Sequence, residues 1–436
     1  MSALEQLGEF AATYRPDERA RMAARLHAAD TVGAWLAATG TREGRALAAL
    51  RKPDAPVADR ITINCAMTRL SEVDDIHLGS MITPAAIVIP AALTIGSTLG
   101  RVDLDDMTAA VVAGYEAMIR FGAAIDGPTV LYRGIWPTYF AAPLGVAAVA
   151  ARLLRLDDTK AAHALANAFI MMTPGTGHHA APSTARWLAV GQAAARGWQA
   201  AVAAQNGFTS DLKLADGDFL KNVYGITPNV ALLHEGLGEL ALHQTSFKPW
   251  CAARQTMAAT QALKEIIAGG VAVESITGIE AAVLPPHLKM IDHGVTAGDR
   301  FSHLTSVQYQ MAVGALTPEA AYDIGGPQGA ISAALQSFMA LIKVRPDEGL
   351  LAEGYPKGWA AHVAVTTASG RHEKRVKQVP GDPGAPLGDS ELKAKFAHVT
   401  TGVLIGDQVE RMFVHGLEAL ARPRDALLSI EAFEPR

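Results

Sequence analysis

The sequence predicts a mainly α-helical protein, in which a smaller α+β domain is inserted into a large all-helical domain. Up to about residue 265, apolar residues recur at steps of three and four, which is the spacing of one helix face. Alternation of apolar and polar residues, which is typical of strands, begins only near residue 279. Half of the residues are hydrophobic but only 6% are aromatic, and this alanine-rich mix favours closely packed helices.

A chain of 436 residues is too long for one ordinary hydrophobic core, so we expect two domains. The helical domain is predicted over residues 1–265 and the α+β domain over residues 266–400. Helical periodicity returns after that, and we expect residues 401–436 to rejoin the first domain.

The helices follow from periodicity and from residues that are typical of helix ends. Pro16 suits the first turn of the first strong helix, the next two residues are acidic, and Gly40 ends it. A second helix begins at Asp105, and its Glu116 and Arg120 are spaced to form an ion pair. Further helices are predicted over residues 141–154, 160–172, 185–206, 390–396 and 405–420.

Residues 82–100 contain no charged side chain and could be mistaken for a membrane span. Pro84 and Pro90 interrupt this stretch, together with several threonines, serines and glycines. A buried helix in a large helical domain explains this composition better, so we expect no membrane partner.

Strand signals gather in the second domain. Residues 279–283 alternate and stop at a pair of prolines, and residues 361–365 alternate in the same way. Residues 369–370 are a Ser-Gly turn signal, after which residues 371–379 can return as the second strand of a hairpin.

Charge and cysteine content argue against several classes of protein. The net charge is −5 and the pI is about 6.3, whereas a protein that binds nucleic acid normally has a basic face. Cys65 and Cys251 are too few for a disulfide framework or a zinc site. The first residues lack the pattern of a signal peptide, so we expect a cytoplasmic location.

Familiar cofactor motifs are missing from the sequence. No Gly-x-Gly-x-x-Gly follows a strand and no Walker loop occurs, and we interpret Gly175-Thr176-Gly177 as a helix break. His234-Glu235 and His372-Glu373 lack the second histidine of a zinc-protease motif. We therefore expect neither a cofactor nor a metal.

Five groups of residues occur in an order that is found in a known family. They are Asp30-Thr31-Val32-Gly33; Asn64 through Asp74-Asp75 to Thr83-Pro84 and Val88-Ile89-Pro90-Ala91-Ala92; Gly114-Tyr115-Glu116 with Arg120; Lys248-Pro249-Trp250 with Arg254; and Val379-Pro380-Gly381-Asp382-Pro383 with Lys395-Phe396. As an ordered set they resemble the MmgE/PrpD family, which includes 2-methylcitrate dehydratase, cis-aconitate decarboxylase and iminodisuccinate epimerase.

The resemblance implies a mostly helical domain with an α+β lid, usually paired as a homodimer. It implies a small di- or tricarboxylate substrate and chemistry at the carbon next to a carboxylate, without metal or organic cofactor.

The sequence departs from the family at positions that carry chemistry. Thr83, Trp136 and Met257 stand where the resemblance expects histidines. Glu72 replaces the first Asp of an acidic run, and Arg186 replaces a lysine. The fold inference survives these changes, but decarboxylase or dehydratase activity does not carry over directly.

The segment from Glu72 to His77 is the densest cluster of titratable groups in an otherwise apolar region. Proton transfer at carbon needs a base, and a carboxylate or an imidazole can serve. We predict catalytic roles for Asp74, Asp75 and His77, and a place for Glu72 in substrate binding. In the alternative, Asp74 or Asp75 simply caps the next helix.

A carboxylate substrate also needs fixed cations. Lys248 is predicted to hold a substrate carboxylate as part of the catalytic set, and Arg186 and Arg254 are predicted to bind the substrate. In the alternative, each of these cations lies in an ordinary ion pair. We expect Asp74 or Asp75, His77 and Lys248 to converge on one cavity beneath the lid.

Three further residues complete the predicted site. Tyr309 falls where the family has a pocket tyrosine and could donate a proton, although a buried structural tyrosine fits equally well. Thr83 is assigned to substrate binding by its place in the resemblance. His178 is assigned there too, with an exposed loop residue as the alternative.

Three functions remain open from the sequence. The first is a lyase of the hydratase or dehydratase type acting on a hydroxy-polycarboxylate, and the second is an isomerase or epimerase of a related carboxylate. The third is a non-catalytic carboxylate-binding protein that kept the fold. Because the family histidines are absent, we expect decarboxylation less than elimination or isomerisation.

Overall fold

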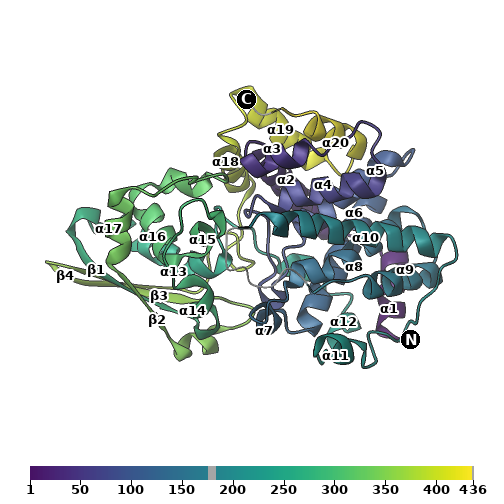
Figure 1. Cartoon of the computed structure of the whole chain (residues 1–436), viewed down its shortest axis with the longest axis horizontal. Helices are drawn as coiled ribbons and strands as arrows, with labels where there is room; N and C mark the ends of the chain where they lie inside the picture. Colours follow the sequence, from purple (N-terminus) through teal and green to yellow (C-terminus); the bar gives the residue numbers. More distant parts are fainter. Residues whose placement is uncertain (175–182, 435–436) are drawn as a thin grey trace. The chain divides into compact units, whose positions relative to one another are not determined.

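The computed structural model describes residues 1–174 and 183–434 (Figure 1). These residues fall into two compact units. The first unit comprises residues 1–174, 184–245 and 400–434, and the second is formed almost wholly by residues 246–399. Helices dominate the first unit and the second combines helices with one sheet, which confirms the mainly α class.

The described part of the first unit contains helices and a single isolated bridge between His77 and Ile82. Its helices are α1 (Ala3–Thr13), α2 (Glu18–Thr39), α3 (Arg42–Ala48), α4 (Val57–Arg69), η1 (Leu78–Ser80), α5 (Ala85–Thr98), α6 (Leu104–Ala124), α7 (Gly127–Leu131), α8 (Pro137–Leu153), α9 (Asp158–Ile170), α10 (Ala185–Gln205), α11 (Phe219–Tyr224), α12 (Ala231–His234), η2 (Ala241–Gln244), α19 (Asp407–Glu418) and α20 (Pro423–Glu431). The expected lack of strands before residue 265 is confirmed for the described residues.

Aspartates cap the start of the long helices α2 and α6. Asp17 is the N-cap of α2, and its carboxylate accepts a hydrogen bond of 2.7 Å from the backbone N–H of Ala20. Pro16 therefore precedes the helix, and its predicted place in the first turn is wrong. Asp103 caps α6 in the same way, by accepting from the N–H of Asp106 at 2.7 Å.

Small residues let the central helices approach closely. Helix α10 packs against both α4 and α8, and α8 also packs against α6. A Cβ on Gly191 would lie 2.1 Å from the carbonyl oxygen of Thr62, and one on Gly197 would lie 2.3 Å from that of Pro143. Only glycine fits at these two contacts, which explains how the alanine-rich sequence builds a dense core.

The uncharged stretch of the sequence becomes the buried helix α5. Its residues Ala85–Gly96 are all buried, and the helix packs against α4, α8 and α20. None of the described helices is both long enough and apolar enough to cross a bilayer. The C-terminal helices return to this unit, where α19 packs on α2 and α20 on α5.

The second unit is built around a four-stranded sheet of order β2-β1-β3-β4. Strand β1 (Ile276–Val283) pairs in parallel with β2 (Ile342–Pro346) and antiparallel with β3 (Ala361–Thr367), which forms a hairpin with β4 (Gly370–Val376). Its helices are α13 (Arg254–Ala268), η3 (Val273–Ser275), α14 (Pro285–Ile291), α15 (Arg300–Thr305), α16 (Val307–Leu316), η4 (Pro318–Tyr322), α17 (Ala333–Ala340), η5 (Glu348–Glu353) and α18 (Asp389–Thr400). Helix α13 packs on β3 and β4, and the apolar core lies between them.

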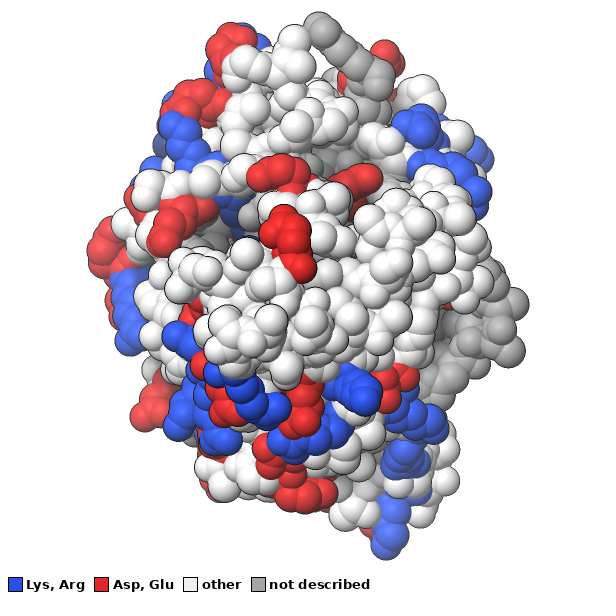
Figure 2. All heavy atoms as spheres, turned by 90° about the vertical axis from the view of Figure 1, so that its left-hand side faces the viewer, with Lys and Arg blue, Asp and Glu red and all other residues white. Residues whose placement is uncertain are grey.

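The edge strand β4 is exposed and carries charges that pair with those of neighbouring elements. Lys374 pairs with Glu265 at 2.8 Å, and Arg375 pairs with Glu353. Figure 2 shows the left-hand side of Figure 1, where Lys and Arg are interleaved with Asp and Glu beside a broad area without charges. Charged side chains on an edge strand discourage pairing with another chain, so we interpret β4 as a protected edge.

Candidate functional site

The acidic segment predicted from the sequence connects α4 to α5 in the first unit. Glu72, Asp74 and Asp75 are all buried. Glu72 has φ 58°, a left-handed conformation that residues other than glycine rarely adopt and that costs about 1–3 kcal/mol. The chain turns sharply there, and the contacts of the Glu72 side chain hold the turn.

Arg69, the last residue of α4, lies between two buried carboxylates. Its Nη1 donates to Glu72 Oε2 at 2.7 Å and to Asp74 Oδ1 at 3.2 Å. Burial alone would lower the pKa of the Arg69 guanidinium, but the charges of Asp74 and Glu72 outweigh it and raise that pKa. The second oxygen of Glu72 accepts from the indole N–H of Trp187 at 3.0 Å.

Asp75 uses both carboxylate oxygens to join three helices. Oδ1 accepts from the backbone N–H of Ala85, the first residue of α5, at 2.9 Å. Oδ2 accepts from the hydroxyl of Tyr115 on α6 at 2.7 Å and lies 2.8 Å from Nδ1 of His27 on α2. Burial, and after it the Asp75 charge, raises the pKa of the Tyr115 hydroxyl well above its usual value, so Tyr115 stays a donor. These contacts favour the capping role of Asp75 over the catalytic one.

His77 is partly exposed and caps the short helix η1. Its Nδ1 accepts from the backbone N–H of Ser80 at 3.2 Å and lies 2.8 Å from the Ser80 hydroxyl. An Nδ1 that accepts a hydrogen bond places the proton of neutral imidazole on Nε2. A general base needs a bare nitrogen, so this tautomer disfavours the predicted role of His77 as base.

Three positions that depart from the family gather at the start of α8. The backbone N–H of Thr83 donates to the hydroxyl of Thr138 at 2.9 Å, and the two hydroxyls lie 3.0 Å apart. Trp136 is the N-cap of α8, and the guanidinium of Arg186 lies 4.1 Å from the centre of its ring. Such stacking fixes the plane of a guanidinium.

Two aromatic residues that sequence reasoning missed complete this cluster. The Nε of Arg186 donates to the hydroxyl of Tyr139 at 3.3 Å. Trp187, next to Arg186 on α10, donates to Glu72 as described above. Trp187 follows directly on Arg186, and Tyr139 lies three residues after Trp136. Their hydrogen-bond partners are over 40 residues away in the chain, so spacing gave no signal. We call Arg69, Glu72, Asp74, Thr83, Trp136, Tyr139, Arg186 and Trp187 the Arg69 cluster.

In the second unit, two sequence motifs that are far apart in the chain are packed together. Arg254 at the start of α13 donates to Asp382 at 2.6 Å, and Asp382 also accepts from the backbone N–H of Val379. The N–H of Phe247 donates to the carbonyl of Gly381 at 2.9 Å. Arg254 is thus held in a buried ion pair within this unit, which favours a structural role over the predicted substrate contact.

Tyr309 is buried at the first turn of α16, with its ring edge-on to that of His303 at 5.0 Å. Burial, helped by Asp323 and Cys251, raises the pKa of Tyr309 to about 12, so its phenol can donate a proton but not accept one at neutral pH. His303 donates from Nδ1 to the carbonyl of Asp299 at 2.8 Å, and burial lowers its pKa. Its Nε2 is therefore a buried bare nitrogen, a potential base that sequence reasoning passed over.

The structure thus gathers four of the predicted residues, Glu72, Asp74, Thr83 and Arg186, in the Arg69 cluster. Lys248 is buried in the second unit, and its convergence with the acidic segment stays a prediction. His178, like the Gly-Thr-Gly interpreted as a helix break, lies outside the described residues.

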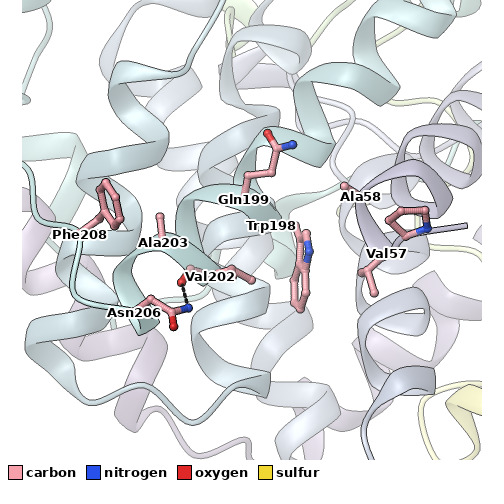
Figure 3. Close-up of a pocket in the computed structure, with 9 residues that line it drawn as sticks. Val57, Ala58, Trp198, Gln199, Val202, Ala203, Asn206 and Phe208 are labelled. Carbon is pink, nitrogen blue, oxygen red and sulfur yellow. Dashed lines mark hydrogen bonds between the residues drawn. The ribbon is translucent and has the colours of Figure 1, made fainter.

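The first unit also carries an open apolar groove between the start of α4 and the end of α10 (Figure 3). Its volume is about 450 Å³, and it is lined by residues such as Val57, Trp198 and Phe208. Its polar lining is limited to Gln199 and Asn206, and the latter donates to the carbonyl of Val202 at 2.8 Å. With no titratable side chain in its lining, this groove offers no acid or base for catalysis.

Metal ligands are not clustered in the described part of the chain. Residues 1–174 and 183–434 contain no group of three or more His, Cys, Asp or Glu side chains arranged to hold an ion. Within the Arg69 cluster, Arg69 is paired with Glu72 and Asp74 instead.

Comparison with known proteins identifies two family domains. The model of the MmgE/PrpD N-terminal domain matches residues 5–223, and that of the MmgE/PrpD C-terminal domain matches residues 250–419. No curated protein matches the chain. The second match begins close to the second unit and extends into the C-terminal return of the first.

Proposed function

Because the chain belongs to the MmgE/PrpD family, whose members are generally enzymes that act on carboxylates, we propose that it is a lyase of the hydratase or dehydratase type. The substrate is a small di- or tricarboxylate with a hydroxyl group. The observation that carries the proposal is the buried Arg69 cluster, in which Arg69 holds two carboxylates. Arg186, next in the chain to the Trp187 that donates to one of these carboxylates, stacks on a tryptophan ring and donates to a phenol.

Asp74 is the proposed base. A positioned carboxylate can remove the proton from the carbon next to a substrate carboxylate. Arg69 holds Asp74 through Oδ1, and the paired charges keep the geometry fixed in a buried setting. The residues at two family histidine positions, Thr83 and Trp136, cannot take a proton at neutral pH, so a carboxylate is the better candidate.

Arg186 is the proposed contact to a substrate carboxylate. Its guanidinium is oriented by Trp136 and by the hydroxyl of Tyr139, and a guanidinium in a fixed plane can bind a carboxylate with two N–H groups. Binding there would draw electron density from the adjacent C–H bond and make its proton more acidic.

The elimination balances with one base and one acid. Asp74 takes the proton, the electrons of the C–H bond form a C=C bond, and the C–O bond breaks. The leaving hydroxyl receives a proton from a phenol and departs as water. Tyr139 is the proposed donor, and Tyr309 of the second unit is the alternative that the sequence indicates.

An isomerase or epimerase of a related carboxylate is the second candidate. The same base would remove the proton, and a group on the other face of the carbon would return one. Proton NMR in heavy water separates the two reactions, since an epimerase exchanges the α-proton without forming an alkene.

A turnover screen on di- and tricarboxylic acids tests the proposal. We expect Asp74→Asn to lower kcat by about 10²-fold or more, the usual contribution of a general base. Asp59→Asn, an exposed change on the same helix as Arg69, is the matched control and keeps wild-type turnover. His77→Ala is expected to stay within about threefold of wild type. A 10²-fold loss in that variant would assign the base to His77, and a wild type that neither converts nor exchanges any acid of the panel would favour the non-catalytic binding protein.

A further inference from the structure

The second unit contains a small cavity whose lining does not include any residue of the Arg69 cluster. Its volume is about 180 Å³, on the order of ten times the ~15 Å³ that one water molecule needs. Residues of α13, α16, η4 and α18 line it, together with Trp250 just before α13. The lining is about half polar in character, since it combines aromatic rings with Lys264, Gln310 and Thr260.

Two buried polar groups of this lining have no hydrogen-bond partner among the described residues. They are the indole N–H of Trp250 and the amide oxygen Oε1 of Gln310. Trp250 is only 3% exposed and Gln310 only 4%. The amide nitrogen of Gln310 is bound to the carbonyl of His303 at 3.0 Å, which fixes which end of the amide is the acceptor. Buried groups are nearly always hydrogen-bonded, so an unsatisfied donor and an unsatisfied acceptor on two residues of the same lining point to a ligand.

Lys264 adds a positive charge to the same cavity. Its Nζ lies 4.7 Å from the centre of the Trp250 ring, and within the described residues no carboxylate oxygen lies within 4.0 Å of it. Burial lowers the pKa of this ammonium, and the more distant Glu319 only partly offsets the effect. A buried ammonium without a carboxylate partner can bind an anion through a charge-assisted hydrogen bond.

Further aromatic surface in the lining suits the carbon part of a ligand. Tyr322 and His398 are stacked, with ring centres 4.6 Å apart and planes at 17°. His398 lies 3.6 Å from Glu319, so this carboxylate already has a neighbour that can donate to it. The unmatched groups are therefore those of Lys264, Trp250 and Gln310.

We propose that this cavity binds a small hydroxycarboxylate. Its carboxylate accepts from the ammonium of Lys264 and the indole N–H of Trp250, and its hydroxyl donates to Oε1 of Gln310. An amino acid is disfavoured, because its ammonium would bring a second positive charge next to Lys264. The inference does not rest on the proposed function, since none of its residues belongs to the proposed machinery of the lyase.

Calorimetric titration of the full chain with L-malate tests the proposal, with succinate and inorganic phosphate as comparison probes. Each titration is performed on the wild type and on Arg186→Met, which removes the proposed substrate contact in the first unit. Malate binding that persists in Arg186→Met and falls by about 10- to 100-fold in Lys264→Met supports the site, since that is the range for losing one bond to a charged group. Lys289→Met, an exposed change in the same unit, is the matched control and keeps the wild-type affinity.

Gln310→Leu tests the role of the hydroxyl. In the wild type, malate should bind about fivefold or more tightly than succinate, and this preference should vanish in Gln310→Leu. Malate affinity that is equal in wild type and in folded Lys264→Met overturns the proposal, as does the absence of malate binding in Arg186→Met. If phosphate binds as tightly as malate and Lys264→Met weakens both equally, the cavity binds an inorganic anion rather than a hydroxycarboxylate. The turnover screen described above is independent of all these outcomes, so the two proposals fail separately.

Discussion

Substitutions of Asp75 can distinguish a structural role from a catalytic one, because the loss of its hydrogen bonds has a predictable effect on the free energy of unfolding. Asp75→Ala removes the acceptor of the Ala85 N–H at 2.9 Å and of the Tyr115 hydroxyl at 2.7 Å. Hydrogen bonds to charged groups contribute about 1.5–3 kcal/mol each. The loss of these two hydrogen bonds alone should lower the free energy of unfolding of the first unit by about 3–6 kcal/mol, and the contact of Asp75 with Nδ1 of His27 at 2.8 Å is lost as well.

Asp75→Asn keeps the shape of the side chain and should lower the free energy of unfolding much less. The amide oxygen still accepts from the N–H of Ala85, and the amide nitrogen can donate to the phenolic oxygen of Tyr115 after its hydroxyl turns. Only the charge assistance is lost, at a cost of about 1–2 kcal/mol. If Asp75 is structural, Asp75→Asn retains turnover within about threefold, whereas a catalytic carboxylate would lose about 10²-fold or more.

Hydrogen exchange on peptides of α5 and α6 measures this effect, because it reports the opening free energy of the first unit by itself. Turnover of the same variants is measured on the acid that the screen identifies. A loss below about 1 kcal/mol in Asp75→Ala, or a 10²-fold loss of turnover in Asp75→Asn, would refute the structural assignment.

Two further predictions concern the second unit. Burial, and after it the Arg254 charge, lowers the pKa of His287 to about 3, against 6.5 for the free side chain. The contribution of neutral His287 to stability is complete above pH 6.5 and is lost at about 1.4 kcal/mol per pH unit as the pH falls toward the folded pKa. In urea unfolding, His287→Gln should therefore remove about 2 kcal/mol of the stability that the wild type loses between pH 6.5 and 5. An unchanged dependence of stability on pH would contradict this. A Cβ on Gly381 would lie 2.2 Å from the carbonyl oxygen of Phe247, whereas Gly270 has a similar φ and open space around it. In urea unfolding, Gly381→Ala should therefore lower the free energy of unfolding by at least about 2 kcal/mol more than Gly270→Ala does. Equal losses would show that the contact with Phe247 relaxes freely.

Periodicity predicted most of the helices because their apolar faces are long and regular. The uncharged stretch became α5, and the predicted helix over residues 185–206 became α10 (Ala185–Gln205) almost to the residue. The hairpin of β3 and β4 also followed from a local turn signal. Strand β2 (Ile342–Pro346) was missed, since it is only five residues long and is defined by its parallel pairing with β1 across some 60 residues of sequence.

The site was less predictable because its decisive contacts are non-local. The acidic segment is conspicuous in sequence, but only the partners of each carboxylate distinguish a cap from a base. Asp75 meets Tyr115 and Asp74 meets Arg69, and neither pairing follows from spacing along one helix. The tautomer of His77 likewise depends on one backbone N–H, that of Ser80, which no side-chain pattern reveals.

The three positions at which the family histidines are replaced have different surroundings in the structure. Met257 is completely buried in the apolar core of the second unit, where a polar side chain would need a partner. Thr83 and Trp136 instead lie at the start of α8 and contact polar groups: Thr83 bonds to Thr138, and Trp136 supports the guanidinium of Arg186.

The Trp136–Arg186 stack bears on whether the chain kept a function. A lone loss of a catalytic histidine would leave its neighbours unchanged, but here an arginine stands where the family resemblance expects a lysine, and it packs on the tryptophan that stands where a histidine is expected. Trp136 and the hydroxyl of Tyr139 orient this buried guanidinium, and a guanidinium in a fixed plane suits a carboxylate. The paired change therefore fits a remodelled carboxylate site better than a decayed one. Since neither residue of this pair is a base, we propose that proton transfer passes to Asp74.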